Sequence, residues 1–463
     1  MSSLPRIAAY RCALLALSFG GLAACRQVED LREAIDPPGA PHEEYADGLR
    51  EAGLDGTALG EEWLTAAERA LAEPQAIALP YREAVYVSAA EPRAFGFRVV
   101  LEQGQMLSVL VERQAREPVR IFLDAFEPPR DTTEGPRRRG SADSAGLTLT
   151  MEADEADTVL VRVQPELLRD VRLTITLEAR GALAFPVAGR DSRAVQSLFG
   201  APRDAGARSH HGIDIFAPRG TPVIAAAAGR ASVRENRLGG KVIFVRDPQR
   251  GISMYYAHLD SQLVSSGDEV HLGDTIGLVG NTGNARRTPP HLHFGIYRRG
   301  QGPRNPYTYV HQPRSGPEPV GRDTTLLGTL ARVRAASAVV RSVPDARGAE
   351  RARLARREVV RVVGVSGGWA RAESPDGTSG WVRVTQLISV ESPLRSERLA
   401  AGAALRDAPH TAALVKASLS AGERVDVLGD ADGARLVRAN GGVVGWLVDS
   451  PDERRAANEA GTD

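Results

Sequence analysis

Hydrophobic and polar positions follow different patterns along the chain, and each pattern predicts a different type of structure. In residues 42–76 apolar side chains recur every three or four positions, with an interruption between Gly53 and Gly56. This spacing predicts two short helices that form a hairpin. Residues 77–180 instead alternate apolar and polar positions in six short segments: Phe95–Leu101, Leu107–Val111, Val119–Leu123, Leu147–Met151, Thr158–Val163 and Val171–Leu177. Short strands at this spacing predict a β-sandwich, in which the Pro- and Arg-rich interval 127–140 is an exposed loop.

The C-terminal part of the chain repeats itself at an offset of 65 residues. Each unit contains short apolar stretches and ends in Gly-Trp, and the matched pairs include Arg341/Arg406, Pro344/Pro409, Gly364/Gly429 and Trp381/Trp446. The pattern resembles tandem bacterial SH3-like barrels, which we expect at residues 328–390 and 395–450. Trp381 and Trp446 would either close the core of each barrel or form a wall-binding surface, and the sequence supports both interpretations equally.

The N-terminus has the composition of a secretory signal. Arg6 and Arg11 precede an uncharged run that is too short to cross about 30 Å of hydrocarbon as a helix. The run ends in Leu-Ala-Ala-Cys, which resembles the lipobox of bacterial lipoproteins. The resemblance implies that the signal peptide, residues 1–24, is removed and that Cys25 carries a lipid at the start of a tether, residues 25–41. A plain signal peptide with an incidental cysteine is the alternative.

A lipid at Cys25 would anchor the protein to a membrane of the cell envelope, outside the cytoplasm. In a Gram-negative host this predicts the outer membrane, facing the periplasm, because Arg26 and not aspartate follows the cysteine. We expect residues 451–463, at the other end of the chain, to be a disordered tail.

Charge and cysteine content exclude several classes of protein. The 58 basic and 58 acidic residues of the 463-residue chain give a formal net charge of zero. The net charge therefore gives no reason to expect a nucleic-acid partner. Both cysteines lie within the first 25 residues. The body of the protein therefore has neither a disulfide scaffold nor a cysteine-ligated metal site.

Histidines are concentrated in one window, which indicates chemistry there. Seven of the nine lie between His210 and His311, and histidine is the commonest metal ligand and titrates nearest neutrality. The segment His291-Leu292-His293 begins a β-like run, so both imidazoles should share one face while Leu292 faces the core. By itself, an HxH spacing on a strand is more often incidental.

A second spacing joins a histidine to a carboxylate. The segment from His210 to Asp214 has the pattern of a loop that enters a strand, where these two side chains can converge on one ion. Two imidazoles and one carboxylate, with an open fourth position, are the ligand type of hydrolytic zinc. Solvent in that position has its pKa lowered to about 7, which gives hydroxide at neutral pH.

Further motifs occur in a fixed order, and the whole set resembles the LytM/lysostaphin-type zinc peptidases. The motifs are Gly212-Ile213-Asp214, Ala217–Val223, Tyr256-Ala257-His258-Leu259, Gly267–Val270, Gly273–Gly277, Gly280–Gly283 and His291–Phe294. The resemblance covers residues 184–312. It implies a small, mostly antiparallel β domain with the zinc ion in a groove across the sheet.

The same resemblance implies a role for each of five side chains. His210, Asp214 and His293 occupy the positions of the zinc ligands. His258 and His291 occupy the positions of the catalytic pair, which orients or deprotonates the attacking water and stabilises the tetrahedral oxyanion. Which histidine performs which task stays open, because two such rings can titrate as a coupled set.

The loop before the HxH motif departs from the family pattern. It contains Asn284–Pro290, whose prolines stiffen it through their fixed φ. Arg286 or Arg287 would either contact a carboxylate of the substrate or be a solvated loop charge.

The sequence therefore predicts a mainly β, multidomain protein with a helical hairpin, a β-sandwich, a LytM-type antiparallel β peptidase domain and two SH3-like barrels. The resemblance implies a membrane-anchored zinc endopeptidase that hydrolyses peptide bonds in peptidoglycan during cell-wall remodelling, with barrels that raise the local substrate concentration. Its partners would be the wall peptide and, through Cys25, a membrane. The alternative is a non-catalytic LytM-type regulator whose partner is a cell-wall amidase, and a third interpretation is a structural wall-binding lipoprotein. The five occupied positions favour the enzyme.

Overall fold

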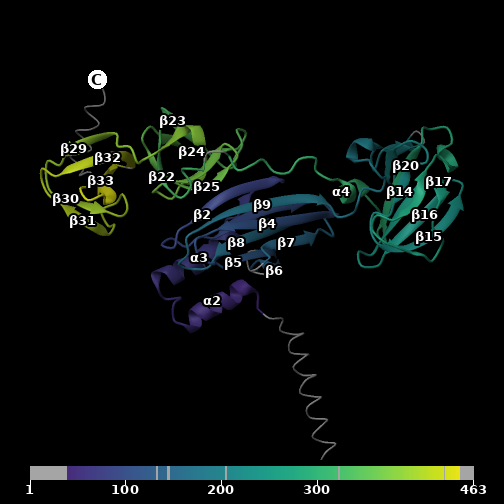
Figure 1. The fold of residues 1–463 in the computed structure, drawn as a ribbon, viewed down its shortest axis with the longest axis horizontal. Helices are drawn as coiled ribbons and strands as arrows, with labels where there is room; N and C mark the ends of the chain where they lie inside the picture. The colour runs from purple at the N-terminus through teal and green to yellow at the C-terminus, as the bar shows by residue number, and fades with distance from the viewer. Residues whose placement is uncertain are drawn as a thin grey trace, which may run out of the picture. The chain divides into compact units, whose positions relative to one another are not determined.

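The computed structural model describes residues 39–131, 134–142, 146–203, 206–321, 324–431 and 433–448. The expected signal peptide, the lipobox cysteine Cys25, nearly all of the tether and the tail at 451–463 lie outside these residues. Most of the described elements are strands in several sheets, as the prediction of a mainly β, multidomain protein requires (Figure 1). Among the described residues, no helix combines the length and the apolar character needed to cross a membrane.

The chain divides into two compact units, Met1–Thr65 and Ala66–Asp463, with the boundary inside a helix. The two N-terminal helices are α2 (Pro41–Glu51) and α3 (Ala58–Ala72). Pro41 lies in the first turn of α2. Proline, which lacks a backbone N–H, is tolerated there because N–H groups in the first turn have no acceptor within the helix.

The apolar stripe of the first unit is a packing surface. Trp63 is buried, stacks on His42 with 4.7 Å between ring centroids, and meets the edge of Tyr45 at 5.0 Å. The His42 ring is therefore packed within this unit.

Two sheets form the sandwich, and apolar side chains such as Phe97, Leu107 and Ile175 fill the space between them. The first sheet has the order β1 (Gln75–Ala76), β3 (Phe95–Leu101), β8 (Asp157–Pro165), β5 (Ile121–Glu127) and β6 (Arg137–Ser141). The second contains β2 (Tyr81–Val87), β9 (Val171–Gly181), β4 (Gln105–Gln114) and β7 (Thr148–Glu152).

Each of the six segments with alternating polarity overlaps a strand of this sandwich, although Val119–Leu123 begins two residues before β5 and Leu147–Met151 one residue before β7. The expectation that the whole interval 127–140 is a loop was wrong, because β6 begins at Arg137 and pairs with β5. β6 is an edge strand with exposed arginines, and charged side chains on an edge strand conceal the alternation that marks a half-buried strand.

The first C-terminal repeat continues the second sheet of the sandwich. Ala84 and Val85 of β2 pair with β25, which gives an eleven-stranded sheet. The repeat consists of β22 (Leu330–Val333), β23 (Ser337–Arg341), β24 (Glu350–Ala355), β25 (Val359–Ser366), β26 (Trp369–Glu373), β27 (Ser379–Arg383) and β28 (Leu387–Ser389). Across this junction the buried Glu83 carboxylate pairs with Arg371, whose guanidinium lies 5.3 Å from the Trp381 ring centre.

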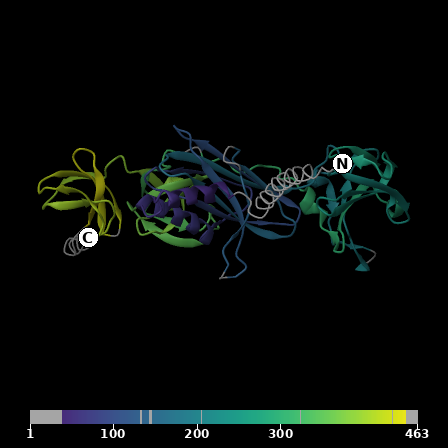
Figure 2. The ribbon, with the colours of Figure 1, turned by 90° about the horizontal axis from the view of Figure 1, so that it is seen from below.

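The second repeat forms its own six-stranded sheet (Figures 1 and 2). Its strands are β29 (Arg395–Arg398), β30 (Ala403–Arg406), β31 (Val415–Leu419), β32 (Arg424–Ala431), β33 (Ala434–Arg438) and β34 (Val444–Val448). Arg341 pairs with Trp381 across two strands of the first repeat, and Arg406 pairs with Trp446 in the same way in the second. The residues matched at an offset of 65 are therefore equivalent in structure.

Both tryptophans of the repeat are core residues. Trp381 is 1% exposed and belongs to the apolar cluster of the sandwich, while Trp446 is 5% exposed among residues of the repeats. Their burial favours the core interpretation over a wall-binding surface made by these indoles.

A ten-stranded antiparallel sheet carries the histidine-rich region. Its main path runs through β10 (Val195–Ser197), β13 (Ile213–Phe216), β20 (His291–Arg298), β17 (Ile252–Gln262), β16 (Gly240–Asp247), β15 (Gly229–Asn236) and β18 (Glu269–Val270). β14 (Pro222–Ile224), β19 (Thr275–Val279) and β21 (Gly302–Arg304) join at its sides, and the short helix α4 (Pro306–Val310) follows. Side chains such as Ile213, Tyr256 and Phe294 form the core beneath it.

Candidate active site and metal centre

Two neighbouring strands, β13 and β20, place three of the five candidate side chains on one face. They pair antiparallel, with Asp214 opposite His293 and Phe216 opposite His291. Leu292, between the two histidines, is fully buried. Because side chains alternate along a strand, His291 and His293 both point away from the core, as the HxH spacing predicts.

His210 reaches the same place from a hairpin that precedes β13. Its backbone N–H donates to the Ala201 carbonyl at 2.9 Å, and its ring Nδ1 lies 2.9 Å from the Leu198 carbonyl oxygen. A bond from Nδ1–H to that oxygen fixes the tautomer and leaves Nε2 with its lone pair free to bind a ligand. The His210 ring is 4% exposed, so its orientation is held by packing as well.

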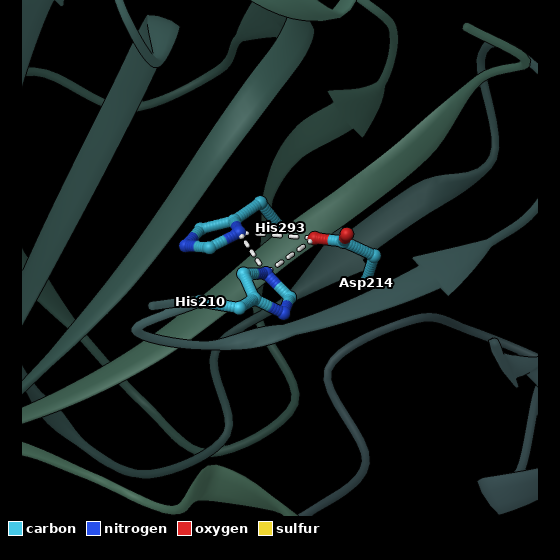
Figure 3. A group of neighbouring side chains, drawn as sticks. All are labelled: His210, Asp214 and His293. Atoms are coloured by element: carbon cyan, nitrogen blue, oxygen red, sulfur yellow. Dashed lines mark hydrogen bonds and ion pairs between the residues drawn. The ribbon is translucent and has the colours of Figure 1, made fainter. Parts of the chain in front are cut away.

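Three donor atoms converge at this point (Figure 3). His210 Nε2, Asp214 Oδ1 and His293 Nδ1 are each 3.0 Å from the other two. Zinc binds such atoms at about 2.0–2.2 Å, so one ion can touch all three. In the described part of the chain, this is the one cluster of histidine, cysteine or acidic side chains arranged to hold a metal ion.

The protonation states of this cluster suit a cation. Burial by itself would raise the pKa of Asp214, but the interactions of its carboxylate with the His210 and His293 rings outweigh burial and hold that pKa below its ordinary value. Burial lowers the pKa of His293, against the opposing attraction of Asp214. Metal ligands must be a carboxylate and neutral imidazoles, and the lowered pKa values of Asp214 and His293 favour these states.

His258 lies on β17 in a backbone conformation that is rare for a residue with a side chain. Its φ is +64°, in the left-handed region, where strain is typical of functional sites. Its ring Nδ1 lies 2.9 Å from the Thr282 carbonyl oxygen. The neighbouring Gly283 packs against Gly240 so closely that a Cβ at Gly283 would lie 2.3 Å from the Gly240 nitrogen. The Gly-Asn-Thr-Gly motif therefore holds the acceptor of the His258 ring in place.

His291 is oriented in a similar way. Its Nδ1 lies 2.9 Å from the Pro289 carbonyl oxygen, and its ring stacks on Phe216 with 5.0 Å between centroids. The His258 ring lies 5.1 Å from the His291 ring and 5.9 Å from the His293 ring. A bond from Nδ1–H to a carbonyl leaves Nε2 as the basic nitrogen of both His258 and His291.

The pKa of His258 reflects this crowding. Burial, together with the neighbouring His291 and His293 rings, lowers it to about 4. His258 is therefore neutral at pH 7 and able to accept a proton.

The five side chains line a groove of about 720 Å³. Its walls include the aromatic side chains of Phe216, Phe244, Tyr255 and Tyr297. The described residues that line the groove all lie between positions 196 and 297. No described part of the sandwich or of the repeats therefore covers the groove.

The two arginines of the loop before the HxH motif and the other histidines of the window are not part of the donor triangle. Arg286 and Arg287 are exposed and do not belong to the groove lining, although their neighbours Ala285 and Thr288 do. The His271 side chain is 84% exposed, and the His311 ring is hydrogen bonded to Ser192 at 2.9 Å. His211 lines the groove without a place in the donor triangle.

Two residues of the site were missed in the sequence. Arg203 donates a hydrogen bond to the Asp214 carboxylate at 2.7 Å, and Ser197 lies between Arg203 and His210. Neither residue has a spacing that marks it, because the hairpin that brings Arg203 back to Asp214 is a tertiary feature.

Two family models match parts of this chain. The model of the family described as Peptidase family M23 matches residues 208–306, which include all five candidate side chains. The model described as Bacterial SH3 domain matches residues 334–388, within the first repeat.

Similar proteins each match a part of the chain. The L-Ala--D-Glu endopeptidase of Bacillus subtilis is 37% identical over 127 residues, 26% of this chain and 39% of that protein. The peptidoglycan DD-endopeptidase ShyC of Vibrio cholerae is 40% identical over 88 residues, 19% of this chain and 20% of that protein. A solved structure of LytU aligns with 27% of this chain and 88% of its own length, at 33% identity and a TM-score of 0.24. This chain carries a peptidase family M23 domain, followed by a bacterial SH3 domain.

Proposed function

We propose that this protein is a zinc endopeptidase that hydrolyses peptide bonds in peptidoglycan during cell-wall remodelling. The observation that carries the proposal is the convergence of His210, Asp214 and His293 on one point of a groove that also holds His258 and His291. The printed names of the two relatives, an L-Ala--D-Glu endopeptidase and a peptidoglycan DD-endopeptidase, support the substrate class.

In this proposal His210, Asp214 and His293 hold the zinc ion. A bound zinc ion supplies a Lewis acid and lowers the pKa of a coordinated solvent molecule. His258 and His291 present their Nε2 atoms to the groove, where one accepts the proton of the attacking water and the other stabilises charge on the peptide carbonyl oxygen. The open groove admits an extended peptide along the aromatic side chains.

The other parts of the chain would support the peptidase domain, residues 184–312. These parts are the helical hairpin at 42–76, the sandwich at 77–180 and the SH3-like repeats at 328–390 and 395–450. The pairing of β2 with β25 supports treating the sandwich and the first repeat as one body. Binding to the wall through the repeats would use surfaces other than the buried indoles.

The lipobox supports an anchor in the cell envelope. With residues 1–24 removed and Cys25 acylated, the protein would be held at a membrane outside the cytoplasm. Fractionation tests this proposal, because Cys25→Ser should move the protein from the membrane to the soluble fraction. An unchanged membrane fraction would contradict the anchor.

The proposed activity is tested with the purified protein and isolated sacculi. We expect one bound zinc ion, release of muropeptides, loss of release with a chelator and recovery on addition of zinc. Mass spectrometry of the products identifies the cleaved bond from its new termini. A zinc-loaded protein that releases nothing from sacculi, yet stimulates a cell-wall amidase, would contradict the enzyme and support the regulator.

A further inference from the structure

Arg203 joins two of the proposed zinc ligands. Its Nη2 atom donates to Asp214 Oδ2 at 2.7 Å and to Ser197 Oγ at 2.6 Å. The Ser197 hydroxyl in turn lies 3.3 Å from Nδ1 of His210, as a second and more distant partner of that N–H beside the Leu198 carbonyl at 2.9 Å. One guanidinium therefore contacts Asp214 directly and His210 through a hydroxyl.

Backbone pairing fixes the position of Arg203 relative to His210. β11 (Pro202–Arg203) pairs with β12 (Arg208–Ser209), which leads directly into His210. The His210 carbonyl also accepts a bond from the Gly200 N–H at 2.8 Å. Arg203 and His210 are thus parts of one hydrogen-bonded hairpin, from which the guanidinium reaches Asp214.

The two oxygens of the Asp214 carboxylate have different partners. Oδ1 faces His210 and His293 at 3.0 Å each, whereas Oδ2 is bound by Arg203. The Asp214 side chain is only 12% exposed, so little solvent is present to take the place of the guanidinium. The bond from Arg203 stops the carboxylate from rotating and directs one oxygen toward the ion.

We propose that Arg203 is a positioning residue for the metal centre, which holds Asp214 with Oδ1 toward the ion and, through Ser197, restrains His210. The inference rests on the zinc site of the proposed function. Two effects of Arg203 oppose each other, because its charge repels a cation while its hydrogen bonds orient the ligands. The Arg203 side chain is 33% exposed and its charge is paired with Asp214. Screening therefore weakens the repulsion, and orientation prevails.

Zinc affinity of the full chain, measured by competition with a chromophoric chelator, tests the role without substrate. Arg203→Met should weaken zinc binding by about 10–100-fold, the usual effect of losing a partner of a metal ligand. Arg203→Lys should have an intermediate effect, because an ammonium keeps the charge but lacks the planar fork. Ser197→Ala should have a smaller effect. The control is Arg286→Met, which removes an exposed arginine that does not line the groove.

A second readout separates positioning from general stability. The visible spectrum of the cobalt-substituted protein reports ligand geometry, and it should change in Arg203→Met but not in Arg286→Met. The inference would be overturned if Arg203→Met had wild-type zinc affinity and an unchanged cobalt spectrum, or if it bound zinc more tightly than the wild type. In either case the proposed zinc site itself would still stand. A wild type that binds no zinc would overturn both. If metal-free Arg203→Met does not fold, Ser197→Ala and Arg203→Lys decide the question by the same criteria.

Discussion

Asp214 and His293 are directly opposed on neighbouring strands, and Oδ1 of the first lies 3.0 Å from Nδ1 of the second. Opposed side chains on an antiparallel pair lie close together on the same face. A shift of one residue between β13 and β20 would turn one of the two toward the core. Burial of Ile213, Ile215 and Leu292 on the other face opposes such a shift. The metal centre thus depends on the same register that packs the core.

Removal of one proposed ligand should abolish the response of the protein to zinc. An ion that binds only the folded state stabilises it by about 2.7 kcal/mol at a concentration of 100 times Kd. We expect zinc to raise the Tm of the metal-free wild type and to leave the Tm of Asp214→Ala unchanged. Differential scanning calorimetry with and without zinc measures this. An equal rise in Asp214→Ala would show that the ion binds elsewhere.

Loss of His291 should affect catalysis without affecting the metal. Its Nδ1 is bonded to Pro289 and its ring lies outside the donor triangle, so His291→Ala should retain zinc. We expect kcat on sacculi or muropeptides to fall by roughly 10²–10⁴-fold, the usual contribution of general acid–base catalysis. His271→Ala, at an exposed position, is the control. Loss of zinc from His291→Ala would instead indicate a ligand role.

Protonation of His258 should destabilise the metal-free protein at low pH. The folded-state pKa of about 4 lies below the ordinary value of 6.5, so the unfolded chain binds the proton first as the pH falls. The stability contributed by neutral His258 is therefore present above pH 6.5 and is lost between pH 6.5 and 4, to a total on the order of 3 kcal/mol. Urea unfolding in chelator should show a smaller loss in His258→Gln than in the wild type, where the remaining loss includes that from His293, whose pKa burial also lowers.

The exposed His271 provides a matched control for this experiment. His271→Gln should follow the pH dependence of the wild type, because that side chain is 84% exposed. Parallel curves for the wild type and His258→Gln would contradict the shifted pKa.

The two tryptophans matched at an offset of 65 should stabilise different parts of the protein. Trp381 packs into the sandwich core and Trp446 does not, so Trp381→Ala should destabilise the sandwich together with the first repeat, by about 3–5 kcal/mol. Trp446→Ala should destabilise the second sheet. Hydrogen exchange followed by mass spectrometry locates each effect. Loss of protection confined to the first repeat in Trp381→Ala would contradict a shared body.

The arginines of the loop before β20 should not contribute to turnover. Arg286 and Arg287 are exposed and lie outside the groove lining, so the double substitution by alanine should leave kcat/KM on wall fragments unchanged. Steady-state kinetics on purified muropeptides measures this. A raised KM would restore the hypothesis that one of them contacts a substrate carboxylate.

Local patterns in the sequence were enough to predict which side chains share a face. Alternation along a strand put His291 and His293 on the side opposite Leu292, and the repeat at an offset of 65 identified Trp381 and Trp446 as equivalent. These properties depend on residues close in sequence or on a repeated pattern. Both are therefore visible without knowledge of the fold.

Which strands lie side by side, and in which register, depends on contacts between distant segments and became visible only in the folded protein. The opposition of Asp214 to His293, the bond from Arg203 to Asp214 and the burial of Trp381 in the sandwich all join segments that the chain order separates. Side chains alternate with a period of two along any strand, whichever strand it pairs with, so the alternation does not identify the partner. The pairing of strands is instead determined by the combined packing of residues that are distant in sequence. Local sequence patterns do not contain this information.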